Sequence, residues 1–258
     1  MTELSKIFSV AQELALETGQ FLLSRFGSDF KVSKKGRINL VTEVDLKAEE
    51  MIVGRIRQEF PHHEILAEEK GSYTCESSYK WIVDPIDGTT NYAHGYRFFC
   101  VSIAVEYKGQ IVLGVIYDPI TEELFSARRG RGAFLNSRKI FVSGRDLLAD
   151  SLLCTGFSYD VEEIKENLEL FNRIILHARA VRRDGSAALD LCYVACGRFD
   201  GFWELSLQPW DVAAGTLIVS EAGGLLTNFN GTDCTIYGQQ ILATNGRIHR
   251  DLIQLLTA

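Results

Sequence analysis

Residues 81–92, Trp-Ile-Val-Asp-Pro-Ile-Asp-Gly-Thr-Thr-Asn-Tyr, constrain the fold more than any other part of the chain. The apolar residues that open this segment predict a buried strand, and Asp84 and Asp87 follow it directly. A proline between the two acids and a glycine after them predict a sharp turn, which lets both side chains point at one spot beyond the strand end. Hard divalent cations bind carboxylate and carbonyl oxygens, and the Ile86 carbonyl lies between the acids. The segment therefore indicates a metal site at a strand end, although turn chemistry alone would explain each dipeptide taken singly.

The residues that follow the second acid suit a phosphate group. Gly88, Thr89 and Thr90 offer closely spaced backbone N–H groups and two hydroxyls. Metal ligands beside a phosphate-binding turn are what the hydrolysis of a phosphate ester needs. No cysteine-based or histidine-based nucleophile motif competes with this interpretation, because the five histidines are scattered and His62 and His63 are expected in a surface turn.

Three further acids lie at the junctions between predicted elements. Asp45 follows Thr42 by three residues, which also fits a capping box that opens a helix. Glu68 follows a short apolar strand, where a solvated turn is the usual interpretation. Asp211 begins a helix of small residues, where the helix dipole favours an acid. Each position has this structural explanation, but the recurrence of acids at junctions favours a shared site.

The apolar periodicity predicts an α/β chain of the layered α+β kind. Helices are expected over residues 4–26, 45–60, 161–178, 186–195, 212–222 and 248–256. Strands are expected over residues 65–67, 81–83, 99–107 and 111–117, and around residues 181, 202, 225 and 241. A hairpin turn at Lys108-Gly109 is expected to join the strands at 99–107 and 111–117, so the first sheet leans towards antiparallel pairing.

Length, charge and cysteine usage limit the class of protein. The 258 residues fit a single catalytic domain with two intimate lobes, about 1–145 and 146–258. The net charge of −7 argues against a protein whose main role is to coat nucleic acid or an anionic membrane. No apolar run reaches the roughly 20 residues that span a bilayer, and the N-terminus does not resemble a signal peptide. Six scattered cysteines without a CxxC pair predict free thiols and a cytoplasmic location.

Two segments, residues 81–92 and Trp-Asp-Val-Ala-Ala-Gly at 210–215, resemble the two signatures of the inositol monophosphatase family. The members of that family are Mg²⁺-dependent and commonly lithium-sensitive phosphomonoesterases. The resemblance covers nearly the whole chain, because Val41–Asp45, Ala67–Glu69, Gly185–Ala188 and Glu221–Gly224 follow in the family's order. It implies an alternating αβαβα sandwich, one catalytic phosphatase domain and a homodimer.

The resemblance also implies a role for each acid. Glu68, Asp84 and the Ile86 carbonyl would hold a first Mg²⁺, and Asp84, Asp87 and Asp211 a second. Glu68 would help to place a weakly bound third ion. Asp45 and Thr89 would orient the attacking water, and Lys34 would approach the metals from a polar loop. The implied substrate contacts, together with the phosphate-binding turn, are Asp87, Gly88, Thr89, Gly185, Ser186, Ala187, Glu204 and Asp211.

The favoured reaction is the hydrolysis of inositol 1-phosphate to myo-inositol and phosphate by metal-activated water. Glu204 is the most informative substrate contact, because a carboxylate accepts hydrogen bonds from a polyol, although its local pattern equally fits an exposed acid at a strand end. Related enzymes of the superfamily that hydrolyse fructose 1,6-bisphosphate, histidinol phosphate or 3′-phosphoadenosine 5′-phosphate are the alternatives within this class.

An alternative of another class is a regulatory protein that binds RNA or a transcription complex on the same fold. Its candidate contact is the segment at 126–132, in which Arg128, Arg129 and Arg131 alternate with glycines. A solvated hairpin turn is the simpler interpretation, since the segment lacks interleaved aromatic residues and the chain is acidic.

Overall fold

The computed structural model describes residues 3–34, 40–158 and 160–258. The side chain of Lys34 and residues 35–39 are outside the described part, so the role predicted for Lys34 falls outside the described residues. Within the described part, no helix is long and apolar enough to cross a membrane. All six cysteines are free thiols, as predicted.

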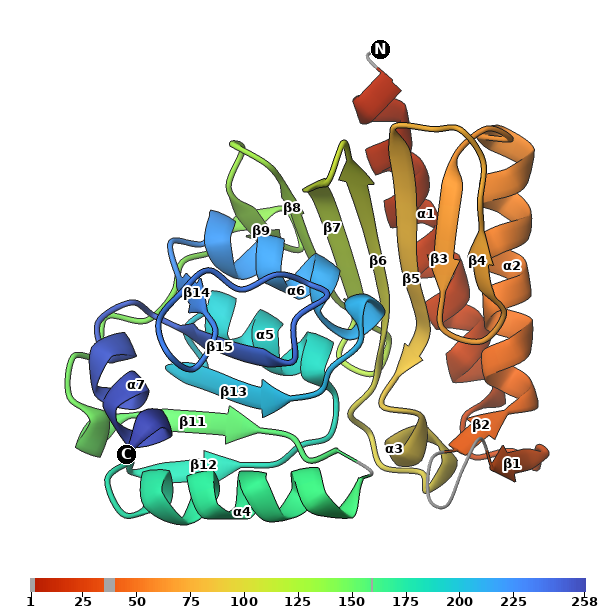
Figure 1. The fold of residues 1–258 in the computed structure, drawn as a ribbon. Helices are drawn as coiled ribbons and strands as arrows, with labels where there is room; N and C mark the ends of the chain where they lie inside the picture. Colours follow the sequence, from red (N-terminus) through yellow and green to blue (C-terminus); the bar gives the residue numbers. More distant parts are fainter. Residues whose placement is uncertain (1–2, 35–39, 159) are drawn as a thin grey trace.

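Helices and strands alternate along the whole chain (Figure 1). The helices are α1 (Glu3–Arg25), α2 (Glu43–Glu59), α3 (Thr89–Ala93), α4 (Val161–Ile175), α5 (Ala187–Ala195), α6 (Pro209–Glu221) and α7 (His249–Thr257), with a 3₁₀ turn at Leu148–Asp150. The strands of the first half are β1 (Val32–Lys34), β2 (Leu40–Thr42), β3 (Glu64–Ala67), β4 (Gly71–Tyr73), β5 (Tyr79–Asp87), β6 (Cys100–Tyr107), β7 (Gln110–Asp118), β8 (Glu123–Arg128), β9 (Ala133–Leu135) and β10 (Arg138–Lys139). The strands of the second half are β11 (Leu152–Thr155), β12 (Ala180–Arg182), β13 (Gly201–Leu205), β14 (Leu225–Thr227) and β15 (Gln240–Thr244).

Two large sheets organise the fold. The first has eight strands in the order β10-β9-β8-β7-β6-β5-β3-β4, and all its neighbours pair antiparallel except β3 and β5. The second has five strands in the order β12-β11-β13-β15-β14, with parallel pairing in β12-β11-β13 and antiparallel pairing in the rest. The small pair β1-β2 stands apart from both.

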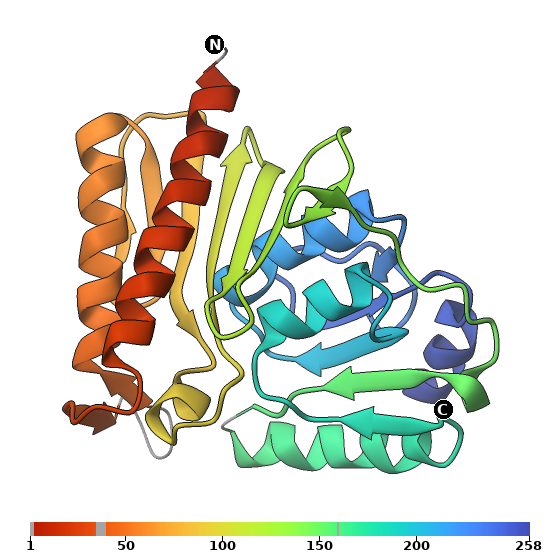
Figure 2. The same cartoon turned by 180° about the vertical axis from the view of Figure 1, so that it is seen from behind.

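Helices cover both faces of each sheet, which gives five layers in the order αβαβα. Helices α1 and α2 cover the outer face of the eight-stranded sheet, as Figure 2 shows from behind. Helices α5 and α6 pack against each other between the sheets, and α4 and α7 lie together on the far side of the five-stranded sheet. Three apolar clusters fill the four interfaces between these layers, because one cluster continues around α5 and α6 to both sheets. The predicted layered α/β fold class is therefore confirmed.

The periodic apolar stripes explain why these helices form. In α1 the residues Ile7, Leu14 and Leu22 recur on one face and are completely or almost completely buried. The predicted helices are all present, with shifted ends. Helix α2 begins at Glu43 because Thr42 caps it, and α6 begins at Pro209 because proline suits the first helical position.

Two local predictions need correction. Pro85 was expected to turn the chain between the acids, but β5 continues to Asp87 and only its pairing with β6 is interrupted. Proline has no N–H for the ladder, so a bulge forms there and the turn comes later. His63 lies in the expected turn, but its side chain is only 8% exposed and stacks against the rings of Phe60 and Tyr79.

Candidate metal and substrate site

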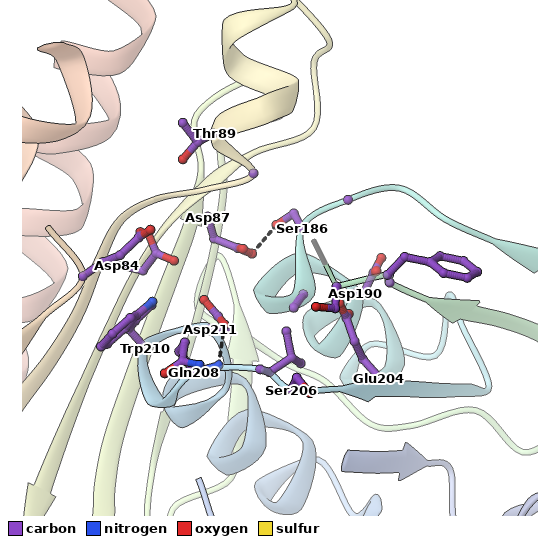
Figure 3. Close-up of a pocket in the computed structure, with 18 of the residues that line it drawn as sticks. Asp84, Asp87, Thr89, Ser186, Asp190, Glu204, Ser206, Gln208, Trp210 and Asp211 are labelled. Atoms are coloured by element: carbon purple, nitrogen blue, oxygen red, sulfur yellow. Dashed lines mark hydrogen bonds between the residues drawn. The ribbon is translucent and has the colours of Figure 1, made fainter. Parts of the chain in front are cut away.

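A cavity of about 380 Å³ lies between the eight-stranded sheet and the second half of the chain. It is lined by the C-terminal end of β5, the start of α3, and the N-terminal ends of α5 and α6 (Figure 3). Of the predicted site residues, all but Asp45 line this cavity: Glu68, Asp84, Ile86, Asp87, Gly88, Thr89, Gly185, Ser186, Ala187, Glu204 and Asp211.

The bulge in β5 brings its two carboxylates together. In a regular strand, residues three apart point to opposite faces, because side chains alternate with a period of two. Asp84 pairs with Ser102 and Asp87 with Cys100, so three steps on β5 match two on β6. One extra residue therefore restores a common direction for the two acids. Their carboxylate oxygens and one from Asp211 lie within 4.8 Å of one another.

Asp211 reaches this cluster from the start of α6. The sequence predicts an acid favoured by the helix dipole there, and the structure adds a cap: Asp211 Oδ2 accepts a hydrogen bond of 2.7 Å from the backbone N–H of Gln208 (Figure 3). The carboxylate also contributes to the cluster with Asp84 and Asp87. The structural and the functional interpretation of Asp211 are thus compatible, because one oxygen of a carboxylate can cap while the other binds.

The electrostatics of the cluster favour a bound cation. Burial raises the pKa of Asp84 well above its ordinary value, and the neighbouring charges of Glu68, Asp87 and Asp211 raise it further. Burial also raises the pKa of Asp87 to about 6, although hydrogen bonds from Ser186 and Ala188 lower it. An all-oxygen set of buried, mutually repelling carboxylates suits a hard divalent cation such as Mg²⁺ better than a soft metal.

Glu68 is held at the cavity by a residue that the sequence analysis missed. Glu49 of α2 is completely buried and accepts hydrogen bonds from the backbone N–H groups of Glu69, at 2.7 Å, and Lys70, at 2.9 Å. These bonds fix the turn that follows β3 and carries Glu68. A single sequence offers no local signal for this contact, because twenty residues separate its partners.

Asp87 is oriented by the start of α5. Its Oδ2 accepts hydrogen bonds from the Ser186 hydroxyl at 2.5 Å and from the backbone N–H of Ala188 at 2.7 Å. Ser186 is also the N-cap of α5, where it accepts from the Leu189 N–H. The predicted pair Asp87 and Ser186 therefore lies in direct contact and links the end of β5 to the start of α5 (Figure 3).

Thr89 connects the cavity to Asp45 behind it. The Thr89 hydroxyl lies 2.9 Å from Asp45 Oδ1 and 3.0 Å from the Ile86 carbonyl oxygen. Asp45 is completely buried, and its Oδ2 accepts from the Thr42 N–H and hydroxyl, at 2.8 and 2.5 Å. The capping box and the contact with Thr89 coexist, so both interpretations of Asp45 describe real geometry. The turn into α3 uses Gly88 at φ 95°, a left-handed conformation that favours glycine.

Glu204 and Asp190 lie across the cavity from Asp84 (Figure 3), and Phe157 and Arg183 also line the cavity. Glu204 is not an exposed strand-end acid, because it is 8% exposed and its side chain faces the cavity. Asp190 of α5 was not predicted, although an acid inside the apolar run Leu189–Cys192 was a visible signal. Among the described residues that line the cavity, Arg183 is the one cation.

Comparison with known proteins gives a consistent likeness. A model of the inositol monophosphatase family matches residues 3–258. An inositol-1-monophosphatase of Synechocystis sp. is 43% identical over 260 residues, which cover 100% of this chain and 91% of that protein. A Nus factor SuhB of Pseudomonas aeruginosa is 43% identical over 228 residues, covering 86% of this chain and 84% of that one. The solved structure of an inositol monophosphatase from Anabaena (Nostoc) sp. matches with a TM-score of 0.90 at 44% identity, covering 99% and 97% of the two chains.

Proposed function

The chain belongs to the inositol monophosphatase family, a family of phosphatases, and from this premise we propose that it hydrolyses the phosphate monoester of a polyol, with inositol 1-phosphate as the leading substrate. The observation that carries the proposal is the cluster of Asp84, Asp87 and Asp211 at the mouth of a cavity whose far wall bears Glu204. The first three carboxylates suit metal ions, which would in turn bind the phosphate, and the fourth suits hydroxyl groups.

Two to three Mg²⁺ ions are proposed as the cofactor. Glu68, Asp84 and the Ile86 carbonyl would hold one ion, and Asp84, Asp87 and Asp211 another, while Glu68 would help with a third. When bound, Mg²⁺ supplies neutralisation of the phosphoryl charge and acidification of water, which are the main demands of phosphate ester hydrolysis.

The chain's own residues supply orientation and a proton acceptor. The Thr89 hydroxyl faces the cavity and has the Asp45 carboxylate behind it, so a proton taken by Thr89 can be passed to Asp45. Thr89 and Asp45 would thereby orient the attacking water. Gly88 and Thr89 would contact the phosphate, and Gly185, Ser186 and Ala187 would contact the alcohol part together with Glu204.

The test is phosphate release from a panel of inositol 1-phosphate, fructose 1,6-bisphosphate, histidinol phosphate and 3′-phosphoadenosine 5′-phosphate, with Mg²⁺ or with a chelator. We expect the highest kcat/KM for inositol 1-phosphate, complete loss with the chelator, and loss in Asp87→Asn. A preference for another member of the panel would overturn the substrate and keep the site. The absence of Mg²⁺-dependent release from every member would overturn the reaction itself.

A second candidate role is regulatory binding to a transcription complex, beside catalysis. It is supported by the name Nus factor SuhB of one relative. The arginine segment gives little further support, because it forms a hairpin turn between β8 and β9. In that turn the Arg129 side chain donates to the Ile111 carbonyl, and Arg128 lies over the Phe8 ring. Unchanged association of an Arg128→Ala, Arg129→Ala, Arg131→Ala triple variant with RNA polymerase complexes would count against this segment as the contact.

The homodimer, the cytoplasmic location and the single domain with two lobes, about 1–145 and 146–258, belong to the same proposal. Sedimentation of the purified protein tests the dimer, for which a mass near twice 28.9 kDa is expected.

A further inference from the structure

We propose that Asp190 is a second carboxylate that binds substrate, and that it accepts a hydrogen bond from one hydroxyl of the alcohol part while Glu204 accepts one from a neighbouring hydroxyl. The inference rests on the proposed function, because it concerns the far wall of the same cavity. It adds a specificity residue to the site and narrows the substrate to alcohols with adjacent hydroxyl groups.

The position of Asp190 is set by the first turn of α5. Its backbone N–H donates to the Ser186 carbonyl at 3.0 Å, so it lies one helical turn beyond the residue that orients Asp87. The side chain lines the cavity although the residue is only 1% exposed. Figure 3 shows Asp190 on the same side as Glu204, with Asp87 and Asp211 between them and Asp84.

One oxygen of the Asp190 carboxylate lacks a hydrogen-bond partner in the described part of the chain. Among the described residues, its Oδ1 is one of two buried side-chain oxygens or nitrogens without one. Nearly all buried polar groups are hydrogen-bonded, because an unpaired one carries a desolvation cost. A hydrophobic helix position that keeps such a group needs a compensating role, and a donor from a ligand in the cavity would supply the missing bond.

Glu204 lines the same cavity. Burial and neighbouring charges, and no hydrogen bond, account for the raised pKa of its carboxyl group. The carboxylate lies against Gly156, where an added Cβ would stand 2.1 Å from both oxygens. The backbone at the end of β11 thus leaves room for this carboxylate without donating to it, so both acids turn unused acceptors towards one cavity.

The charges around the pair favour hydroxyl groups over a second phosphate. Burial raises the pKa of both Asp190 and Glu204 well above the ordinary values, and the Glu204 charge adds to the shift of Asp190. The positive charge of Arg183 lowers the pKa of both groups, but Arg183 is exposed to solvent. A second phosphate beside two acids would be repelled, whereas neutral hydroxyls donate to carboxylates and also accept from a protonated one.

The test compares Asp190→Asn with the wild type in saturating Mg²⁺ on inositol 1-phosphate and 4-nitrophenyl phosphate, with histidinol phosphate as a third substrate. Inositol 1-phosphate carries the hydroxyls, whereas 4-nitrophenyl phosphate has none and reacts through its good leaving group. We expect kcat/KM for inositol 1-phosphate to fall about 10- to 100-fold, because asparagine replaces one acceptor oxygen by an N–H₂ group and leaves the other oxygen uncharged. For 4-nitrophenyl phosphate we expect a fall of at most about threefold, since no hydroxyl bond exists to lose.

Thermal unfolding separates substrate binding from a structural role. Asparagine relieves the buried unpaired charge, so the unfolding temperature of Asp190→Asn is expected to equal or exceed that of the wild type. The matched control is Asp184→Asn. Asp184 is a half-buried acid that contributes to the raised pKa of Asp190 but does not line the cavity. We expect the Asp184→Asn variant to keep kcat/KM for inositol 1-phosphate and for 4-nitrophenyl phosphate within about twofold of the wild type.

Three outcomes would overturn the assignment of Asp190. They are equal losses on both substrates with a lowered unfolding temperature, no loss on inositol 1-phosphate, and a greater loss on histidinol phosphate, which would indicate an ammonium site. The wild type alone tests the proposed function. That function fails if the wild type shows no Mg²⁺-dependent phosphate release from inositol 1-phosphate. That result would overturn both proposals, whereas the three outcomes above leave the phosphatase function standing.

Discussion

Replacing Glu49 by glutamine tests whether this buried residue positions Glu68, the proposed metal ligand. Glu49 accepts from two backbone N–H groups, at 2.7 and 2.9 Å, in the turn that follows Glu68. A hydrogen bond to a charged group is worth about 1.5–3 kcal/mol. Glutamine has the same size but keeps one acceptor and places an N–H₂ group where the other was. Since removing the buried charge offsets part of the loss, we expect the free energy of unfolding to fall by about 2 kcal/mol.

Two measurements check this expectation. Calorimetry should show an unfolding temperature lower by about 4–8 °C, and the Mg²⁺ concentration for half-maximal phosphate release should rise about tenfold. The matched control is Glu50→Gln, one residue further along α2. Glu50 is exposed and forms an ion pair with Lys47, which is also exposed, so neither quantity should move measurably. A Glu49→Gln variant that loses stability but keeps the Mg²⁺ dependence of the wild type would refute the positioning role.

Three further changes have defined expectations. Asp45→Asn should lower kcat about 100-fold with KM changed less than about threefold, because the Thr89 hydroxyl loses its proton acceptor, and equal kcat values in steady-state kinetics would contradict this. Gly156→Ala should raise KM for inositol 1-phosphate at least about tenfold, since the new Cβ would stand 2.1 Å from the Glu204 carboxylate oxygens; an unchanged KM would show that Glu204 does not contact the substrate. Burial raises the pKa of Asp87 from the unfolded value of 3.8 to about 6. Between these two pH values the folded protein without metal binds more protons than the unfolded chain, so its free energy of unfolding falls by up to about 3 kcal/mol as the pH rises from 3.8 to 6. The rise in unfolding temperature caused by Mg²⁺ should therefore be larger at pH 7 than at pH 5, and a rise independent of pH would count against this titration.

The sequence was most informative where local pattern and chemistry coincide. The segment at 81–92 predicted a buried strand that delivers two acids to one point, and the structure has that strand. The means by which the acids converge was not predictable. Proline and glycine signal a break, but whether the break is a turn or a bulge depends on the pairing with β6, which comes from a later part of the chain.

Burial decided the residues that the sequence left ambiguous or missed. The local pattern around Glu204 fits an exposed acid equally well, and only the approach of Gly156 and α5 makes it buried. Glu49 looks like any charged residue of an amphipathic helix until the turn after β3 packs against it. Short strands such as β8, β9 and β11 were not anticipated, because their pairing rather than their composition defines them.

Asp45 and Asp211 show that a structural explanation for an acid does not exclude a functional one. Each caps its helix through Oδ2, and each also takes part in the site: Asp45 contacts Thr89, and Asp211 joins the carboxylate cluster. A carboxylate can do both, because it has two oxygens and several lone pairs that accept hydrogen bonds or bind a metal ion.

The most direct test of the central claim is the rate of phosphate release from inositol 1-phosphate as a function of Mg²⁺ concentration, for the wild type and for Asp211→Asn. A cluster of Asp84, Asp87 and Asp211 that holds catalytic Mg²⁺ predicts saturable activation of the wild type and at least about a 100-fold loss in the variant. The variant should still unfold cooperatively. Equal Mg²⁺-dependent rates in the two proteins, or hydrolysis by the wild type that persists in excess chelator, would contradict the account.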